Sequence, residues 1–386
     1  MTTLLATALV AAFALGGPAT PLRVTAENTL PFARAAQTIE LTRAQLAPLG
    51  EQDLSKIHVT TSDGRELVVQ AVDTDYDAYH TPDIVIFQSD FAAHERRTFT
   101  VSAGARHRYV PADYKAYGRF VRERFDDFAW ENDRIAHRTY GKALETWKGE
   151  PLTSSAIDIW SKLGPKLVVN EWYMMGDAYY HAMTDNGADD YSAGPTRGDG
   201  GNGVWAGGRL WPAPNFVASR ELANGPIRVL FELDYPAFAV GGRQITEVLR
   251  VSLDAGSQLD HYRVAFTAAG GDSTLVGAVG LKKVAGEHVT FDAGRGALVT
   301  WQAMEKKLGM QGLAAIVDPA RVVGDTADSA NNLLLARTGA GGSLDYWAGF
   351  AWNRAGRIAD EGAWQRYVRE YADGLRTPIV VRVSTP

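Results

Sequence analysis

The sequence predicts a mostly β protein: a small β-sandwich at the N-terminal end, then a large antiparallel β-domain with a few helices. Three observations favour this class. Short alternating or β-rich segments separated by turns fill the N-terminal part, and one turn reads Ser62-Asp-Gly-Arg65, a strong hairpin signal. Gly is frequent (39 residues), and 10 Trp, 15 Tyr and 14 Phe lie among the Gly-punctuated segments. No repeat of fixed period is present, which disfavours propellers and solenoids.

The expected elements fall into two groups. The first group of strands covers residues 22–26, 38–41, 56–61, 66–72, 83–88 and 97–103. The second group is longer and richer in aromatics, and covers residues 128–139, 225–235, 244–253, 258–268, 288–291 and 297–302. The clearest helix is 361–375, where Trp364, Val368 and Tyr371 recur at helical spacing before Pro378. Short helices are expected over 144–148 and 155–163.

A chain of 386 residues exceeds one ordinary core, so two units are expected: a sandwich over 21–107 and a catalytic domain over 108–386. Residues 1–20 read as a signal peptide, because an apolar stretch from Leu4 to Leu15 precedes small residues and Pro18. The usual positive charge at the start of such a signal is missing. The pattern predicts export to the periplasm or beyond, with no membrane-spanning segment after cleavage.

Composition narrows the function classes. Hydrophobic residues make up 46% and charged residues 22%, with a net charge of −6 and no basic block, so a nucleic-acid partner is disfavoured. The absence of Cys excludes disulfides, thiolate metal sites and a Cys nucleophile. No phosphate loop, dinucleotide fingerprint, Gly-x-Ser-x-Gly or His-Glu-x-x-His motif is present, so no cofactor is expected.

The segment 128–141 is the first functional candidate. Read as one strand, it places Trp130, Asn132, Arg134 and Arg138 on one face, with polar groups on the other face too. Such a strand fits the floor of a polar cleft in which Arg134 grips a carboxylate. The alternative is an edge strand with solvated ion pairs.

The segment 170–201 is the second candidate, expected to be mostly loop and rich in polar and aromatic groups. His181 suits acid/base chemistry near neutral pH, and Tyr191 is a second proton-transfer candidate. Trp172, Tyr179 and Arg197 are expected to bind substrate. The alternative for His181 is a packed loop histidine without a catalytic role.

A metal-binding alternative exists for the same segment. Asp177, His181, Asp185 and Asp189 recur every four residues, a set that could hold Ca²⁺ or Mn²⁺. Gly187 argues against a continuous helix, and the spacing matches no standard loop, so the expectation without a metal comes first.

A third group lies on two later strands. Glu232 and Asp234 share one face of their strand, and His261 follows on another. If that face lines a concave sheet, Glu232 and His261 form an acid/base pair. The alternative is the ordinary polar face of a half-buried strand.

Together these segments resemble a bacterial family known as domain-of-unknown-function family 4861. The resemblance rests on Trp-Glu-Asn-Asp-Arg-Ile-Ala from Trp130, on Gly-Pro-Thr-x-Gly-x-Gly-Gly from Gly194, and on Asn224-Gly-Pro-Ile-Arg228 followed by Phe231-Glu-Leu-Asp-Tyr235. It covers nearly the whole chain after residue 20. Members tend to be encoded beside pectin- and uronate-degrading enzymes, which implies a role in using acidic polysaccharides.

A looser likeness is to the galactose-mutarotase-like supersandwich, in which an Asn-Arg-Ile strand helps hold the sugar. Here the strand reads Asn132-Asp-Arg-Ile135, with one residue inserted, so roles do not transfer position by position. The likeness implies that the large domain is an antiparallel supersandwich. The fold alone does not fix the reaction.

The leading hypothesis is a lyase that cleaves uronic-acid-containing saccharides by β-elimination. In that scheme Arg134 and Arg197 hold the carboxylate, and His181 or Tyr191 is the base. Glu232 or His261 is then the opposite partner. Sugar epimerisation, glycoside hydrolysis and non-catalytic carbohydrate binding remain open alternatives.

Overall fold

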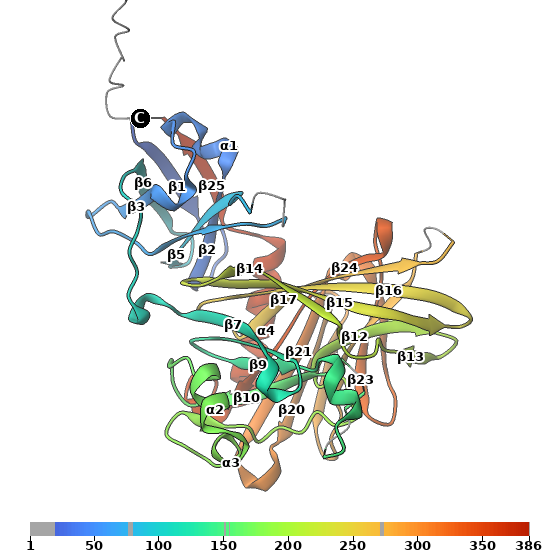
Figure 1. Cartoon of the computed structure of the whole chain (residues 1–386). Helices are drawn as coiled ribbons and strands as arrows, with labels where there is room; N and C mark the ends of the chain where they lie inside the picture. Colours follow the sequence, from blue (N-terminus) through green and yellow to red (C-terminus); the bar gives the residue numbers. More distant parts are fainter. Residues whose placement is uncertain (1–19, 76–79, 150–151, 154, 271–273, 386) are drawn as a thin grey trace, which may run out of the picture.

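The structure is a computed structural model that describes residues 20–75, 80–149, 152–153, 155–270 and 274–385. It is mostly β, as predicted, and all its strand ladders are antiparallel (Figure 1). The predicted signal segment 1–20 lies outside the described residues except for Thr20. No helix in the described part of the chain has both the length and the apolar character needed to cross a membrane.

The small sandwich pairs a four-stranded sheet with a three-stranded one. The first sheet runs in the order β25 (Val380–Ser384), β1 (Leu22–Glu27), β6 (Arg96–Ala103), β3 (Ile57–Thr61). The second runs β2 (Arg34–Thr42), β5 (Ile84–Phe91), β4 (Val69–Val72), with the one-turn helix α1 (Arg43–Leu46) after β2. Alternate side chains of β1 and β3 are buried, as half-buried strands require, and together with Phe87 and Phe99 they fill the space between the sheets.

The large unit is a supersandwich around the largest core of the molecule. One layer is an eight-stranded sheet: β14 (Ala218–Asn224), β15 (Arg228–Val240), β16 (Arg243–Asp254), β17 (Leu259–Ala268), β24 (Ser343–Trp352), β21 (Met310–Val317), β20 (Ala297–Ala303), β19 (His288–Asp292). Two five-stranded sheets oppose it. Their orders are β11 (Gly187–Ala188), β10 (Ile157–Lys162), β9 (Ala136–Thr139), β8 (Asp127–Asn132), β7 (Ala116–Val121), and β13 (Arg209–Trp211), β12 (Asp199–Ala206), β18 (Val276–Lys282), β23 (Asn331–Arg337), β22 (Val322–Ala327). Phe128 and Phe231 stack across the layers with ring centroids 4.0 Å apart.

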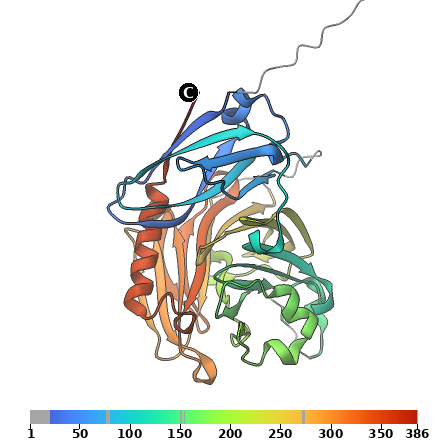
Figure 2. The same cartoon turned by 90° about the vertical axis from the view of Figure 1, so that its left-hand side faces the viewer.

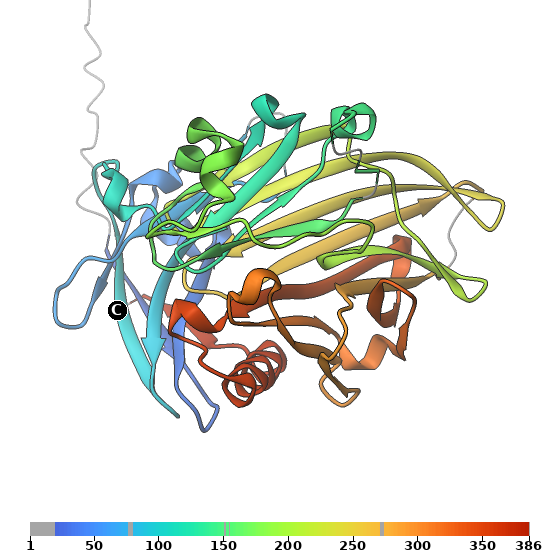
Figure 3. The same cartoon turned by 90° about the horizontal axis from the view of Figure 1, so that it is seen from below.

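Helices cover the outer faces of the supersandwich. α2 (Val169–Met175) and α3 (Asp177–Tyr180) lie over the sheet that contains β8 and β10, whereas α4 (Glu361–Arg376) packs on β20 and β21 (Figures 2 and 3). Asp360 caps α4 by accepting a hydrogen bond from the amide of Ala363 at 2.8 Å, and Trp364 is fully buried beneath the helix. The predicted helix at 361–375 is therefore confirmed.

Two local predictions were wrong. Residues 128–139 form a hairpin of β8 and β9 instead of one strand, because the side-chain oxygen of Asn132 accepts from the amides of Arg134 and Ile135 and closes a turn. Residues 155–163 contain strand β10 instead of a helix, because every residue of β10 is buried between two neighbouring strands. Long-range pairing overrides the local pattern there.

One domain assignment also needs correction. β25 comes from the end of the chain, which the sequence assigned to the second unit, yet it pairs with β1 in the small sandwich. No local signal marks such a long-range pairing.

The Gly-rich run after Thr196 has a packing role. A Cβ atom on Gly198, whose φ is +65°, would lie 1.8 Å from the carbonyl oxygen of Ile157. A Cβ on Gly200, whose φ is +95°, would lie 2.3 Å from the Cβ of Ala348. Only Gly fits where β12 passes so close to β10 and β24.

Candidate functional site

The candidate site lies on the outer face of the β7–β11 sheet, where α2 and α3 cover it. Glu131, fully buried on β8, accepts from the amides of Val168 at 2.8 Å and Val169 at 2.7 Å, and so fixes the N-terminal end of α2. Lys162 neutralises the same carboxylate at 2.6 Å. α2 ends at Gly176, whose φ is +85°, and the chain turns there into the short α3.

His181 follows α3 directly, and its side chain is partly exposed. Its Nδ1 lies 3.0 Å from the backbone carbonyl oxygen of Asp189. A carbonyl only accepts hydrogen bonds, so Nδ1 carries the hydrogen when the ring is neutral, and Nε2 is left as the basic nitrogen. Nε2 lies 3.3 Å from Oδ1 of Asp177, and the side chain is 42% exposed. A partly exposed ring held in one orientation, with a carboxylate beside Nε2 to stabilise the protonated form, suits proton transfer.

Tyr180 and Arg124 adjoin His181. The Tyr180 hydroxyl donates to Asp177 at 2.7 Å, and its ring centroid lies 4.8 Å from that of His181. Arg124, almost buried, is hydrogen-bonded to the same hydroxyl. Burial raises the pKa of Tyr180, and its bond to Asp177 adds to this, whereas the charge of Arg138 opposes them.

The floor of the site is a buried ion network. Arg138 on β9 donates to Asp158 at 2.8 Å and to Asp189 at 2.9 Å, and all three side chains are almost fully buried. Burial raises the pKa of Asp189, and the charge of Arg138 opposes that rise. Burial likewise raises the pKa of Asp127 to about 7. Perturbed carboxyl groups beside a half-exposed His are typical of functional sites.

The surroundings of the site carry apolar surface and a cation. Met174, Met175 and Met183 are 83%, 60% and 43% exposed, which is unusual for such large apolar side chains. Exposed Lys306 pairs with Asp190 at 2.9 Å, one residue along from Asp189.

A groove of about 1020 Å³ lies near the N-terminal end of α2. Three tyrosines contribute to its lining, together with polar side chains of Asp133, Lys166 and Asn170. Aromatic rings beside such polar groups are a common wall for sugars. The tyrosines are Tyr109, Tyr114 and Tyr117.

A second polar cluster is sealed inside the supersandwich core. His137 on β9 lies 3.1 Å from Asp260, which also accepts from the indole N–H of Trp130 at 2.6 Å. Asp199 lies 4.0 Å from the same His137 nitrogen, and burial raises the pKa of Asp199 to about 8. Trp130, His137, Asp199 and Asp260 have no exposed surface, so this cluster does not meet substrate in the present conformation.

A cleft of about 430 Å³ lies where the small sandwich, the outer face of the eight-stranded sheet and α4 meet. His261 stacks on Trp347 with ring centroids 4.7 Å apart and contacts Asp345 at 3.0 Å. Tyr367 and Tyr371 from α4 also line the cleft.

The structure separates the residues that the sequence singled out. Tyr179 lies at the α2–α3 site with His181 and bonds to Glu171 at 3.2 Å, but Trp172 is buried under α2. Glu232 and His261 lie instead on the outer face of the eight-stranded sheet, where Arg220 and Arg250 hold Glu232 at 3.1 Å and 2.7 Å. Neither adjoins His181, because the supersandwich core separates the two faces.

Five further residues lie away from His181, in the core or in the β8–β9 turn. Trp130 and Arg197 are buried in the core, where Arg197 donates to the carbonyl of Ser155 at 2.5 Å. Asn132 closes the β8–β9 turn, and Tyr191 is 8% exposed with the ammonium of Lys282 5.0 Å from its ring centre. Arg134 lies in that turn, 3.7 Å from Asp133.

The four residues considered as a Ca²⁺ or Mn²⁺ site are not aligned by a helix. α3 ends at Tyr180, so Asp177, His181, Asp185 and Asp189 do not line one face of a helix. Asp189 already has Arg138 as its cation. Arg124 was not predicted, because nothing in its local sequence marks it as part of this site.

The fold and the His181 site define a supersandwich protein with a cluster of polar side chains on one outer face. The chain belongs to the family described as Domain of unknown function (DUF4861), which matches residues 26–381. It is 29% identical over 382 residues to a Formosa agariphila protein described as Uncharacterized protein P7, covering 94% of this chain and 93% of that one.

Solved structures of similar fold come from Enterococcus faecalis. One, titled as a protein in the glycosyl hydrolase family 38, is 8% identical with a TM-score of 0.53 and covers 94% of this chain. An alpha-mannosidase from strain V583 is also 8% identical, with a TM-score of 0.47 and the same coverage of this chain. This chain spans 47% and 46% of their lengths, about half. The likeness to the glycosyl hydrolase family 38 protein shows the fold alone.

Proposed function

We propose that the protein is an exported carbohydrate-active enzyme that cleaves uronic-acid-containing saccharides by β-elimination at the α2–α3 site. The observation that carries this proposal is His181, a partly exposed histidine whose ring is oriented by the Asp189 carbonyl and whose Nε2 lies beside Asp177. The tyrosine-lined groove and the fold shared with a glycosyl hydrolase family 38 protein support the carbohydrate class.

The residues of the site fit the steps of elimination. His181 Nε2 removes the proton from the carbon next to the carboxylate, and that electron pair forms a double bond to the adjacent carbon. The bond from this adjacent carbon to the glycosidic oxygen breaks, and the oxygen takes a proton from an acid such as the partly buried Tyr179 hydroxyl. Arg124 and Lys306 supply positive charge for the substrate carboxylate, whose partial neutralisation makes the carbon proton more acidic.

The test uses the purified protein from residue 21 with pectic, alginate and glycosaminoglycan oligosaccharides. Elimination produces a conjugated uronate whose ultraviolet absorbance rises without addition of water. His181→Ala should lower the rate at least a hundredfold. His288→Ala, which removes an exposed histidine paired with Glu361 at 2.8 Å, should leave the rate unchanged.

Other outcomes reassign the reaction. Products heavier by one water indicate hydrolysis, and deuterium uptake at a sugar carbon without cleavage indicates epimerisation. Ligand binding without chemical change in any assay indicates a binding protein and contradicts the proposed activity.

A second candidate function is carbohydrate binding in the junction cleft. Trp347, Tyr367 and Tyr371 supply aromatic surface there, and His261 with Asp345 supplies polar groups. His261→Ala should reduce oligosaccharide affinity if this cleft is the binding site, and should leave affinity unchanged if the α2–α3 site alone binds.

A further inference from the structure

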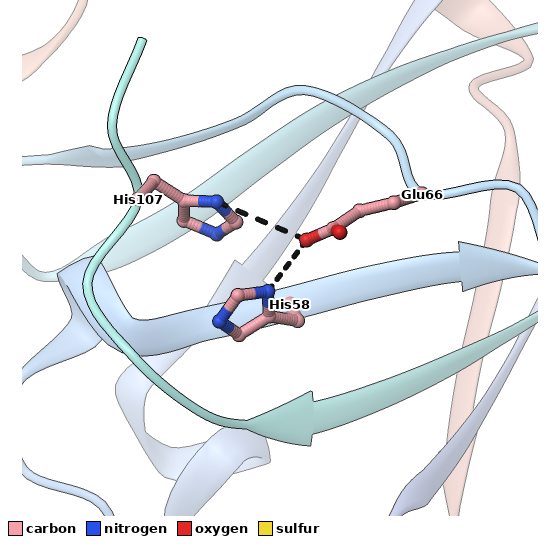
Figure 4. A group of neighbouring side chains, drawn as sticks. All are labelled: His58, Glu66 and His107. Carbon is pink, nitrogen blue, oxygen red and sulfur yellow. Dashed lines mark hydrogen bonds and ion pairs between the residues drawn. The ribbon is translucent and has the colours of Figure 1, made fainter.

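Three potential metal ligands converge on the small sandwich, away from the His181 site. His58 lies on β3, Glu66 bridges back to Thr60 after the Asp-Gly turn, and His107 lies in the segment that follows β6 (Figure 4). One ligand atom from each side chain lies within 4.8 Å of the other two. The sequence analysis did not single out any of these residues, because 49 positions separate the two histidines and no short motif links them.

Backbone carbonyls fix the tautomer of both histidines. Nε2 of His58 lies 2.8 Å from the carbonyl oxygen of Ala105, and Nε2 of His107 lies 2.7 Å from that of Ile57. Because a carbonyl oxygen only accepts, both Nε2 atoms carry the hydrogen. In a neutral ring Nδ1 then has no hydrogen, and its lone pair can bind a metal ion. Metal-binding histidines commonly have this arrangement, with the other ring nitrogen donating to a backbone carbonyl.

Both Nδ1 atoms face the same carboxylate oxygen. Oε1 of Glu66 lies 2.5 Å from Nδ1 of His58 and 3.9 Å from Nδ1 of His107 (Figure 4). Two neutral imidazole lone pairs and a carboxylate repel one another unless a cation lies between them. That cation is either a proton on Nδ1 or a metal ion.

The surrounding backbone holds the two rings in place. The rings lie 4.2 Å apart, and Tyr109 stacks on His107 at 5.3 Å with nearly parallel planes. The amide of Gly104 donates to the carbonyl of Lys56 at 2.9 Å, and a Cβ on Gly104 would lie 2.7 Å from Nε2 of His58. A larger residue at this position would therefore displace the His58 ring.

The donor set selects the class of metal. Two imidazoles and one carboxylate suit Zn²⁺, with Cu²⁺ and Ni²⁺ next, whereas Ca²⁺ and Mg²⁺ prefer sites made of oxygen. Tetrahedral Zn²⁺ with ligand bonds of about 2.1 Å needs ligand atoms about 3.4 Å apart. Glu66 is 53% exposed, so its side chain can move outward from its 2.5 Å contact with His58 to this wider separation. Water can take the fourth position on the metal.

We propose that His58, Glu66 and His107 bind one divalent transition-metal ion, best matched by Zn²⁺, which ties the segment after β6 to the small sandwich. The site has two ring ligands preset by backbone bonds and one adjustable carboxylate. Its role is structural, because it joins the small sandwich to the segment that leads into β7.

The test is Zn²⁺ binding to chelator-treated protein. Calorimetry and metal analysis after gel filtration should give one Zn²⁺ per chain, and Zn²⁺ should raise the melting temperature while Ca²⁺ does not. The double variant His58→Gln/His107→Gln should lose both effects. The matched control His288→Gln, an exposed histidine that also contacts one glutamate, should keep both.

Two further measurements keep the test decisive if the double variant folds poorly. Glu66→Gln alters only a half-exposed side chain and should weaken Zn²⁺ binding at least tenfold. Imidazole nitrogen NMR shifts should show coordination through Nδ1 with hydrogen kept on Nε2. The proposal would be overturned if the parent protein did not bind Zn²⁺. It would also be overturned if Glu66→Gln and the double variant bound Zn²⁺ as tightly as the parent protein does.

Discussion

At the scale of single residues, the molecule keeps many charged and polar side chains out of water by pairing them. Arg138 joins Asp158 and Asp189 beneath His181, and Lys162 joins Glu131 beneath α2. Asp199 differs, because neither of its carboxylate oxygens has a hydrogen-bond partner among the described residues. Its nearest charged neighbours are His137 and, beyond it, Asp260.

Because Asp199 is buried, we expect the stability of the folded protein to decrease as the pH rises. Burial raises its pKa from 3.8 to about 8, so between these values the folded chain holds a proton that the unfolded chain has released. The free energy of unfolding therefore falls as pH rises from 4 to 8, by up to about 1.4 kcal/mol per pH unit from this group. Although burial alone lowers the pKa of His137, Asp260 and Asp199 raise it overall, so His137 acts in the same direction.

Urea unfolding at pH 5 and pH 8 measures this effect. The parent protein should lose more stability between the two pH values than Asp199→Asn, which has no proton to release. Asp325→Asn, on the outer strand β22, is the control and should behave as the parent does. Equal pH dependence in the parent and in Asp199→Asn would show that Asp199 is ionised in the folded chain.

At the scale of elements, the α2–α3 unit owes its position to one carboxylate. Glu131 is fully buried, neutralises Lys162 and accepts from two amides at the start of α2. α3 begins at Asp177, two residues after the end of α2, and His181 directly follows its last residue, Tyr180, so the placement of α2 also places His181.

Removing that carboxylate should therefore destabilise the chain. Glu131→Gln leaves Lys162 charged and buried without its partner, and we expect a loss of about 3–5 kcal/mol in the free energy of unfolding. Glu171→Gln, in the exposed pair with Lys166, should cost no more than about 1 kcal/mol. Chemical denaturation of both variants checks the difference; similar small losses would contradict the role of Glu131 in α2.

The sequence predicted elements well where local pattern and tertiary pairing agree, as in β16, β17 and α4. It failed where a single side chain redirects the backbone, as Asn132 does between β8 and β9. It also failed at β10, whose fully buried residues show no alternation. At the site, His181 stood out by its chemistry, but Arg124 and Arg138 reach it only through the pairing of distant strands.

At the scale of the whole molecule, three polar sites lie on different parts of the two sandwiches. The His181 site lies on the outer face of the β7–β11 sheet, and the His261 cleft lies on the outer face of the eight-stranded sheet beside α4. The His58–Glu66–His107 cluster lies in the small sandwich. This separation means that variants at one location test that location alone.

The central claim is that His181 transfers a proton during β-elimination, and chemical rescue tests it most directly. His181→Ala is assayed on a uronic-acid oligosaccharide that the parent protein cleaves, with and without added imidazole. We expect imidazole to restore part of the lost rate, and the restored rate should increase with imidazole concentration. His261→Ala should cleave the oligosaccharide at the parent rate without imidazole. Full activity of His181→Ala without imidazole, or an inactive variant that binds substrate normally but is not rescued, would contradict the central claim.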